Sequence, residues 1–246
     1  MLEMSPASEP WNFGQQFLRA KTGDTASDLS ALPEPVSAIL VGELLECGLR
    51  IVPRDEMSDA ALRRASGLLQ RIPSLHDVVC EQVKGVIRLG SDDPAVDMGH
   101  SQPRWSGLVF VSFPPPSDVG EIRLVEGVVH EAMHINLTNT GLENLLYEPN
   151  RLVYSPWRET LRPASGVLHG AYVFTCLFRF FQLLVETQSL TSAQTRHVMR
   201  RQSEILREFH ALPREELSSA VGEAGRGLCE WMLDYVGDRI SLDADY

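Results

Sequence analysis

Two histidines and a glutamate lie close together near the middle of the chain, in the run His130-Glu131-Ala132-Met133-His134. Residues four apart lie on one face of a helix, so both imidazoles can bind the same metal ion. Chance would place these residue types at these offsets with a probability on the order of 0.01 for this composition. The flanking residues are apolar and predict a buried helix over about 121–138: Val128, Val129, Met133, Ile135 and Leu137. A buried histidine pair needs partners for its ring nitrogens, and we therefore predict a metal site.

A third ligand decides between a closed structural site and an open catalytic site. The metzincin continuation is excluded, because the chain has Leu137 and Thr140 where that pattern needs glycine and histidine. One alternative is His169, in a second apolar helix predicted over 166–187; it is followed by Gly170, which leaves space for another helix or a substrate to come close. The other alternative is a downstream glutamate, and the candidates are Glu143, Glu148, Glu159 and Glu186.

The order of motifs after the histidine pair resembles a known family. HEAMH is followed by Tyr154-Ser155-Pro156-Trp157-Arg158, then by Leu161-Arg162-Pro163, and then by Leu168-His169-Gly170-Ala171-Tyr172-Val173-Phe174. This ordered set resembles the HExxH-type 2-oxoglutarate-dependent peptide β-hydroxylases of ribosomal peptide natural-product pathways. The resemblance covers about residues 105–185 and includes neither the first hundred residues nor the C-terminal helices.

The resemblance implies Fe(II) rather than zinc, with His130, His134 and His169 as ligands and with 2-oxoglutarate and O₂ as co-substrates. Three protein ligands would then leave open positions on the metal, as in the facial triads of non-haem iron oxygenases. The implied reaction is hydroxylation of a carbon, expected to be a β-carbon, in a ribosomally made precursor peptide.

The same resemblance suggests a role for the arginines. The distal carboxylate of 2-oxoglutarate needs a cationic partner, and a guanidinium binds a carboxylate through two parallel hydrogen bonds. Arg158 and Arg162 are the candidates, with Trp157 and Tyr154 beside them. Contact with the substrate is expected from Tyr172. Enclosure of the reaction is expected from Trp157, Tyr154, Tyr172 and Phe174, although core packing is the simpler interpretation of the last two.

The expected role of Glu131 differs between the possible functions. In an oxygenase it would orient a ligand or the substrate. In a zinc-dependent HExxH peptidase, the first alternative, it would be the general base that deprotonates metal-bound water. A non-catalytic peptide-binding protein braced by a four-ligand metal is the second alternative.

The elements that position these residues predict an α+β protein, predominantly helical, with a small β element before the HExxH helix. Residues 1–34 are expected to form a loose lead-in, and 35–246 a single catalytic domain with its core at about 105–187. Further helices are predicted over about 35–48 and 58–73, after Thr191 in a capping box with Gln194, and after Pro213. Strands are predicted over 83–90 and 106–113, joined by a loop that is either solvated or lines a site.

Composition excludes other classes of function. The chain has 22 Lys and Arg against 33 Asp and Glu, a net charge of −11, which disfavours nucleic acid as a partner. The most apolar stretch, 170–186, contains Arg179 and is expected to be a core helix rather than a membrane span. Four dispersed cysteines and an N-terminus without signal-peptide features favour a cytoplasmic location, and the oligomeric state stays open.

Overall fold

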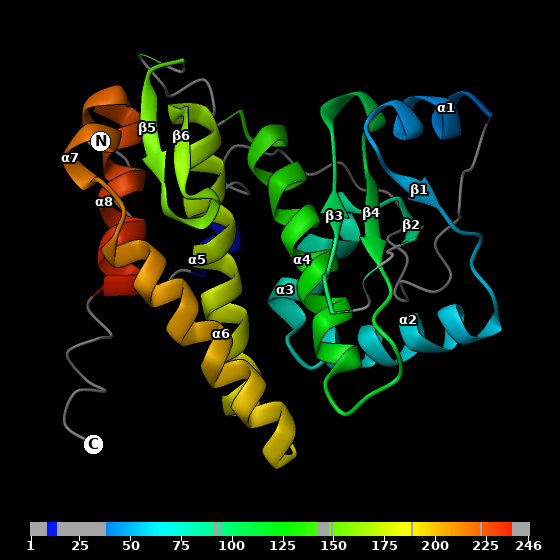
Figure 1. Ribbon diagram of the computed structural model, residues 1–246. Coiled ribbons are helices and arrows are strands. Elements are labelled where there is room, and N and C mark those ends of the chain that lie inside the picture. The colour runs from blue at the N-terminus through cyan, green and yellow to red at the C-terminus, as the bar shows by residue number, and fades with distance from the viewer. Residues whose placement is uncertain are drawn as a thin grey trace. The chain divides into compact units, whose positions relative to one another are not determined.

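The structure is a computed structural model that describes residues 9–13, 38–90, 93, 95–141, 148, 150–187, 189–221 and 223–237. It divides into two compact units (Figure 1). Unit 1 comprises 1–19, 137–182 and 196–246, and unit 2 comprises 20–136 and 183–195. The sequence patterns did not indicate this division, because each unit combines segments that are far apart in the chain.

Unit 2 contains a four-stranded sheet in the order β1-β2-β4-β3. The strands are β1 (Arg50–Ile51), β2 (Gly85–Gly90), β3 (Gly99–His100) and β4 (Leu108–Ser112). β2 and β4 are parallel, whereas β1 and β3 pair antiparallel at the two edges. The predicted strands 83–90 and 106–113 are thereby confirmed, and the loop between them contains the edge strand β3.

The helices of unit 2 are α1 (Ala38–Glu46), α2 (Glu56–Leu69), α3 (Pro73–Gln82) and most of α4 (Gly120–Asn139). α1 ends before Gly48, whose φ of 74° suits glycine. The predicted serine cap at Ser58 is corrected, because Asp55 caps α2 and accepts a 2.8 Å hydrogen bond from the Ser58 backbone N–H. Pro73 does not merely end α2 but begins α3, as a proline in the first turn can.

The core of unit 2 lies on both faces of its sheet. One face carries Leu44, Ile87, Leu89 and Phe110, all buried. On the other face α4 runs along the sheet (Figure 1), and a Cβ added to its Gly127 would meet the Val111 side chain at 3.5 Å. This contact sets the depth at which the HExxH helix packs against β4.

Unit 1 is built on α5 (Ala164–Thr187), the predicted core helix, of which residues up to Gln182 belong to this unit. A hairpin of β5 (Leu152–Ser155) and β6 (Thr160–Pro163), for which the sequence analysis predicted no strands, precedes it. α6 (Ser192–His210) begins in unit 2 and continues in unit 1; its capping box is confirmed, since Thr191 and Gln194 exchange hydrogen bonds of 2.9 and 3.2 Å. After Pro213 there are two helices rather than one, α7 (Arg214–Ala220) and α8 (Glu223–Gly237).

Of the predicted loose lead-in 1–34, residues 9–13 are described and the rest lies outside the described residues. Residues Pro10–Phe13 form a 3₁₀ turn within unit 1, and the Trp11 side chain there is completely buried. Glu9 accepts two hydrogen bonds from Arg179, at 2.8 and 2.9 Å. This ion pair accounts for Arg179, the charged residue that interrupts the apolar stretch of α5.

The fold class is confirmed: the protein is α+β, predominantly helical, with a small β element before the HExxH helix. One described helix, α5, is long and apolar enough to cross a membrane by length and composition, but 72% of its most apolar window is buried inside the protein. Burial of this kind is typical of a core helix. Of the four free cysteines, Cys80, Cys176 and Cys229 are buried and Cys47 is exposed.

Candidate metal and co-substrate residues

The two histidines of the HExxH motif face each other on α4. Their Nε2 atoms are 3.2 Å apart, and the ring centroids are 4.9 Å apart with the planes at 65°. The helical spacing of four residues therefore brings both ring nitrogens to one point, as the sequence predicted. Without a metal, this pair requires one ring to donate a proton and the other to accept it.

The spacing of these nitrogens fits two ligands of one metal ion. Metal–nitrogen bonds to histidine are about 2.1 Å long. Two nitrogens 3.2 Å apart would then subtend an angle of about 100° at the metal, between the values of octahedral and tetrahedral coordination. His130 and His134 thus fit a divalent transition metal without rearrangement of the helix.

Glu131 is held by the edge strand of the sheet. Its side chain is buried, with 4% exposed, and its Oε2 accepts a 2.6 Å hydrogen bond from the Ser101 hydroxyl. Its Oε1 occupies the space that a Cβ would take at Gly99. Because alternate residues of an extended segment face the same side, Gly99 and Ser101 together form a polar cradle for this carboxylate.

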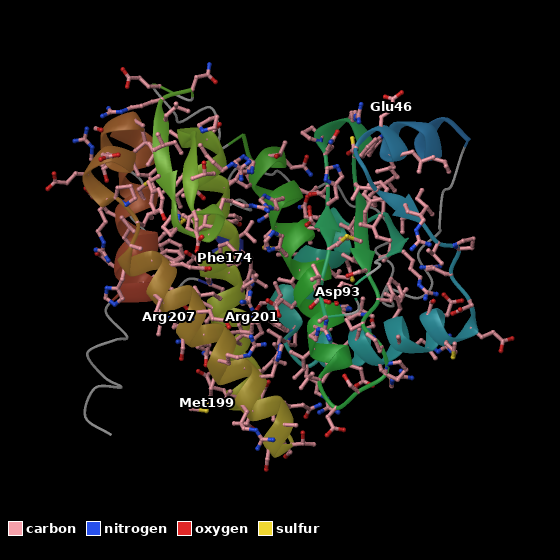
Figure 2. The ribbon with its side chains drawn as sticks, in the orientation of Figure 1. Glu46, Asp93, Phe174, Met199, Arg201 and Arg207 are labelled. Atoms are coloured by element: carbon pink, nitrogen blue, oxygen red, sulfur yellow. The ribbon has the colours of Figure 1, made fainter. Side chains whose placement is uncertain are left out.

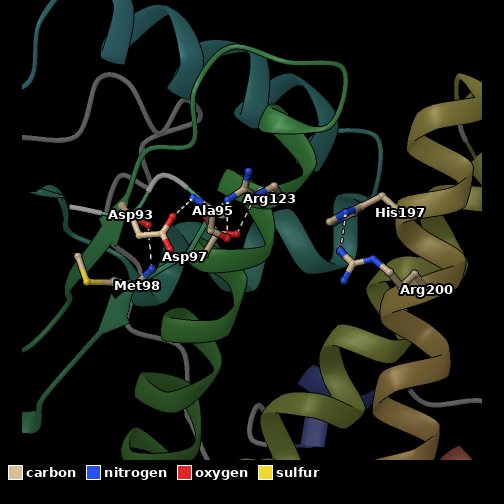
Figure 3. Close-up of polar contacts among 8 residues, drawn as sticks. Asp93, Ala95, Asp97, Met98, Arg123, His197 and Arg200 are labelled. Carbon is tan, nitrogen blue, oxygen red and sulfur yellow. Dashed lines mark hydrogen bonds and ion pairs between the residues drawn. The ribbon is translucent and has the colours of Figure 1, made fainter. Parts of the chain in front are cut away.

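The segment that includes β3 is fixed along α4 at both ends. Arg123 donates to both carboxylate oxygens of Asp97, at 2.8 and 2.9 Å (Figure 3). Eight helical residues from Arg123 to Glu131 span about 12 Å, and four extended residues from Asp97 to Ser101 span about 13 Å. The two lengths match, so the ion pair sets the register in which Ser101 reaches Glu131.

The residues that carry the family resemblance in unit 1 form one local structure. The indole of Trp157, in the 3₁₀ turn Pro156–Arg158, occupies the space that a Cβ would take at Gly170 of α5. Its ring lies 5.4 Å from that of Phe174. Phe174, labelled in Figure 2, lies one turn after Gly170 on α5. A group does approach Gly170 closely, but it is the Trp157 side chain rather than the helix or substrate that the sequence suggested.

The hairpin separates the two candidate arginines. Arg162 is paired with the buried Val153 and is half-buried, and its guanidinium carbon would lie 3.6 Å from a Cβ at Gly166 of α5. Arg158 is exposed. Tyr154 pairs with Leu161 on the opposite face and is 38% exposed, so the hairpin does not bring Tyr154 and Arg162 together.

The other candidates are placed as follows. His169 is half-buried on α5, whereas Tyr172 is completely buried and hydrogen-bonds to Cys176, an arrangement that favours core packing for this tyrosine. Of the four glutamates, Glu148, Glu159 and Glu186 are exposed, and Glu143 lies outside the described residues. Within the described part of either unit, no group of three or more His, Cys, Asp or Glu side chains is arranged to hold a metal ion.

The loop between the two predicted strands was a candidate for lining a site, and Asp97 lies in it, but sequence reasoning missed Gly99, Ser101 and Arg123. A glycine and a serine two apart in a polar loop give no signal of their own, because their role depends on a helix that begins some twenty residues later. The chain matches no protein-family model and no curated protein.

Proposed function

We propose that this protein is an Fe(II)- and 2-oxoglutarate-dependent oxygenase that hydroxylates a carbon, expected to be a β-carbon, of a residue in a ribosomally synthesised precursor peptide. The observation that carries the proposal is the pair of facing imidazole nitrogens, 3.2 Å apart on α4. The motif order that resembles the peptide β-hydroxylases supports iron and 2-oxoglutarate over other metal chemistry. Its segments from Tyr154 to Phe174 form a single packed structure in unit 1, which supports treating them as one motif.

His130 and His134 are the residues that would hold the metal, and the resemblance supplies His169 as the third ligand. Bound iron, with 2-oxoglutarate and O₂, would supply the oxidising power needed to hydroxylate an unactivated carbon. One oxygen atom enters the peptide and the other enters succinate, with release of CO₂.

Arg162 is the better candidate for the distal carboxylate of 2-oxoglutarate. A half-buried guanidinium against α5 binds a carboxylate with less competition from water than the exposed Arg158 does. Trp157 excludes water from the same part of α5 by covering Gly170. Glu131, oriented by Ser101, would position a metal ligand or the substrate.

The cellular setting follows from the composition. The net charge of −11 disfavours nucleic acid, and three buried free thiols suit a reducing compartment, so we place the protein in the cytoplasm. The expected partner is the precursor peptide.

Metal content tests the metal site directly. Anaerobically reconstituted wild-type protein should bind one Fe(II) per chain, and His130→Ala and His134→Ala should each lose it. His210→Ala, which changes an exposed histidine on α6, is the matched control and should retain iron. Full iron binding by both His130→Ala and His134→Ala would contradict the proposed site. The same measurement on His169→Ala tests the third ligand.

Co-substrate binding tests the arginines. Truncation of a desolvated charged partner costs roughly 2–5 kcal/mol, so Arg162→Gln should weaken 2-oxoglutarate binding more than tenfold in an anaerobic titration. Arg158→Gln should bind it as the wild type does. The opposite order would move the clamp to Arg158, and unchanged binding in both variants would remove it from the hairpin.

Turnover tests the reaction. A precursor peptide encoded near the gene, incubated with Fe(II), 2-oxoglutarate and O₂, should gain one oxygen atom with one succinate formed per event. Omission of any one of the three additions should abolish the product.

A zinc-dependent peptidase is the second candidate, and the observation that favours it is the buried Glu131 carboxylate next to His130 in the sequence. In this function the Glu131 carboxylate, which accepts a hydrogen bond from the Ser101 hydroxyl, would take the proton from metal-bound water. Cleavage of the peptide with Zn(II) and water alone, lost in Glu131→Gln, would establish this function and overturn the oxygenase.

A further inference from the structure

Unit 2 contains a cavity of about 710 Å³ at the carboxyl ends of its two parallel strands. Its floor is formed by Leu89 and Gly90 of β2 and by Ser112 of β4. The first half of α2 and the first turns of α4 form its walls. Crevices outside the carboxyl ends of parallel strands are common ligand sites, and this volume suits a small organic molecule.

Three arginines line the cavity: Arg50, Arg64 and Arg88. Its carboxylates are Asp55 and Glu121, so its charged lining sums to +1 in a chain whose net charge is −11. The local sign of charge is therefore opposite to that of the whole protein. This excess of positive charge favours an anion over a cation or a neutral polar molecule.

The guanidiniums retain hydrogen-bonding capacity. Arg64 uses Nε to bind Glu121 at 2.5 Å, and Arg88 uses Nη1 to bind Ser58 at 2.9 Å and Asp55 at 3.3 Å. Among the described residues, the remaining N–H groups of these two arginines have no acceptor. A carboxylate can therefore bind them without breaking the existing pairs.

The rest of the lining is mainly apolar. The Arg88 guanidinium lies 5.8 Å from the ring centroid of Phe113, and three consecutive prolines follow that ring. The apolar side chains of the lining include Met57, Phe113, Pro114, Pro115, Pro116 and Leu124. A fully hydrated inorganic anion would leave this surface wet, whereas an anion with an apolar body would cover it.

We infer that this cavity binds an organic monoanion, a carboxylate attached to an apolar body, with Arg64 and Arg88 at the carboxylate. None of the residues proposed above for iron, 2-oxoglutarate or peptide lines the cavity, so the inference stands whether or not the proposed function does.

The test uses the full-length protein and the probe 4-phenylbutyrate, followed by isothermal titration calorimetry. The uncharged 4-phenylbutanol and inorganic phosphate are the comparison probes. We expect 4-phenylbutyrate to bind at least tenfold more tightly than either, because 4-phenylbutanol cannot accept a charge-assisted hydrogen bond and inorganic phosphate lacks the apolar body. Equal binding of 4-phenylbutanol, tighter binding of phosphate, or no binding of 4-phenylbutyrate would overturn the inference.

Two neighbouring arginines on α2 give a matched pair of variants. Both side chains are exposed, but only Arg64 lines the cavity. Arg64→Gln should weaken 4-phenylbutyrate binding about tenfold, and Arg63→Gln should leave it unchanged. Ala61→Leu, which adds bulk to the lining, should also weaken binding. Equal effects of the two arginine variants, or unchanged binding in both Arg64→Gln and Ala61→Leu, would place the probe elsewhere.

Discussion

In each unit of this protein a candidate site residue occupies the space left by a glycine, and the two contacts differ in chemistry. In unit 2 the Glu131 carboxylate lies over Gly99 and accepts a hydrogen bond from Ser101. In unit 1 the Trp157 indole lies over Gly170 and packs against Phe174. In the first contact a hydrogen bond orients the charged Glu131 carboxylate, whereas in the second the Trp157 ring covers apolar surface of α5.

Because the two contacts differ, substitution of the glycine by alanine should have different consequences at Gly99 and at Gly170. A carboxylate at the end of a flexible side chain can rotate away from an added methyl group at small energetic cost, but it then loses its orientation. An indole in contact with a helix cannot rotate without leaving apolar surface uncovered. Substitution by alanine should therefore affect chemistry in unit 2 and stability in unit 1.

Gly170→Ala should produce the largest loss of stability. The added Cβ overlaps the Trp157 ring, and overpacking of this kind costs about 1–3 kcal/mol, more than alanine gains in helix propensity. Urea denaturation should show a lower midpoint with an unchanged slope. Gly227→Ala is the control in the same unit, because a Cβ there meets nothing within 4 Å; it should raise the free energy of unfolding by up to about 1 kcal/mol. An equal increase in the free energy of unfolding in both variants would show that the Trp157 indole does not depend on the space at Gly170.

Gly99→Ala should lower metal-dependent activity about 10–100-fold, the usual effect of disturbing a group next to a metal ligand. The free energy of unfolding should change by less than about 1 kcal/mol, because only the end of Glu131 must move. Steady-state kinetics and urea denaturation of the same samples check the two statements. A large loss of stability with intact activity per folded molecule would show that the Glu131–Gly99 contact acts on stability, as the Trp157–Gly170 contact is expected to do.

Ser101→Ala should lower the same activity about tenfold, since it removes one charge-assisted hydrogen bond and leaves the space around Glu131 unchanged. Ser101→Thr, which keeps a hydroxyl, should recover part of this loss. Gly99→Ala combined with Ser101→Ala should be little worse than Gly99→Ala alone, because both act on one carboxylate. Full additivity in this double-mutant cycle would separate their roles.

The smallest expected effect is a pH dependence of the free energy of unfolding. It comes from His100, which lies between Gly99 and Ser101 in the sequence. Burial, and to a lesser degree Arg104, lower the pKa of His100. The unfolded chain then binds a proton more readily than the folded chain, so His100 lowers the free energy of unfolding as the pH falls from about 6.5 through its folded-state pKa. The wild type should lose more stability than His100→Gln between pH 7 and pH 5. Parallel curves for the two proteins would show that His100 does not contribute.

Local patterns predicted those parts of the structure that depend on near neighbours. The i, i+4 spacing of His130 and His134 fixed their mutual geometry, and Thr191 with Gln194 fixed the start of α6. The cradle of Glu131 could not be predicted, since Gly99 and Ser101 meet it only through the pairing of β3 with β4 and the Asp97–Arg123 ion pair.

Local patterns were also insufficient at the start of α2, where the capping residue was predicted wrongly, and at the hairpin 152–163, which was not predicted. Both Asp55 and Ser58 are good capping residues, and the Asp55 carboxylate caps α2 by accepting hydrogen bonds from the backbone N–H and the hydroxyl of Ser58. The hairpin 152–163 has too short an alternation to be recognised, and only its register with Val153 and Arg162 opposite each other gives it a face toward α5.

The ion pair between Glu9 and Arg179 joins residues 170 positions apart and has a consequence for synthesis on the ribosome. Most of unit 2 is one continuous stretch, 20–136, which emerges before the main part of unit 1 has been made. At 5–20 residues per second, Glu9 waits roughly 10–30 s for its partner. Unit 2 is therefore expected to fold first during translation, while the N-terminal segment waits for α5 to be synthesised.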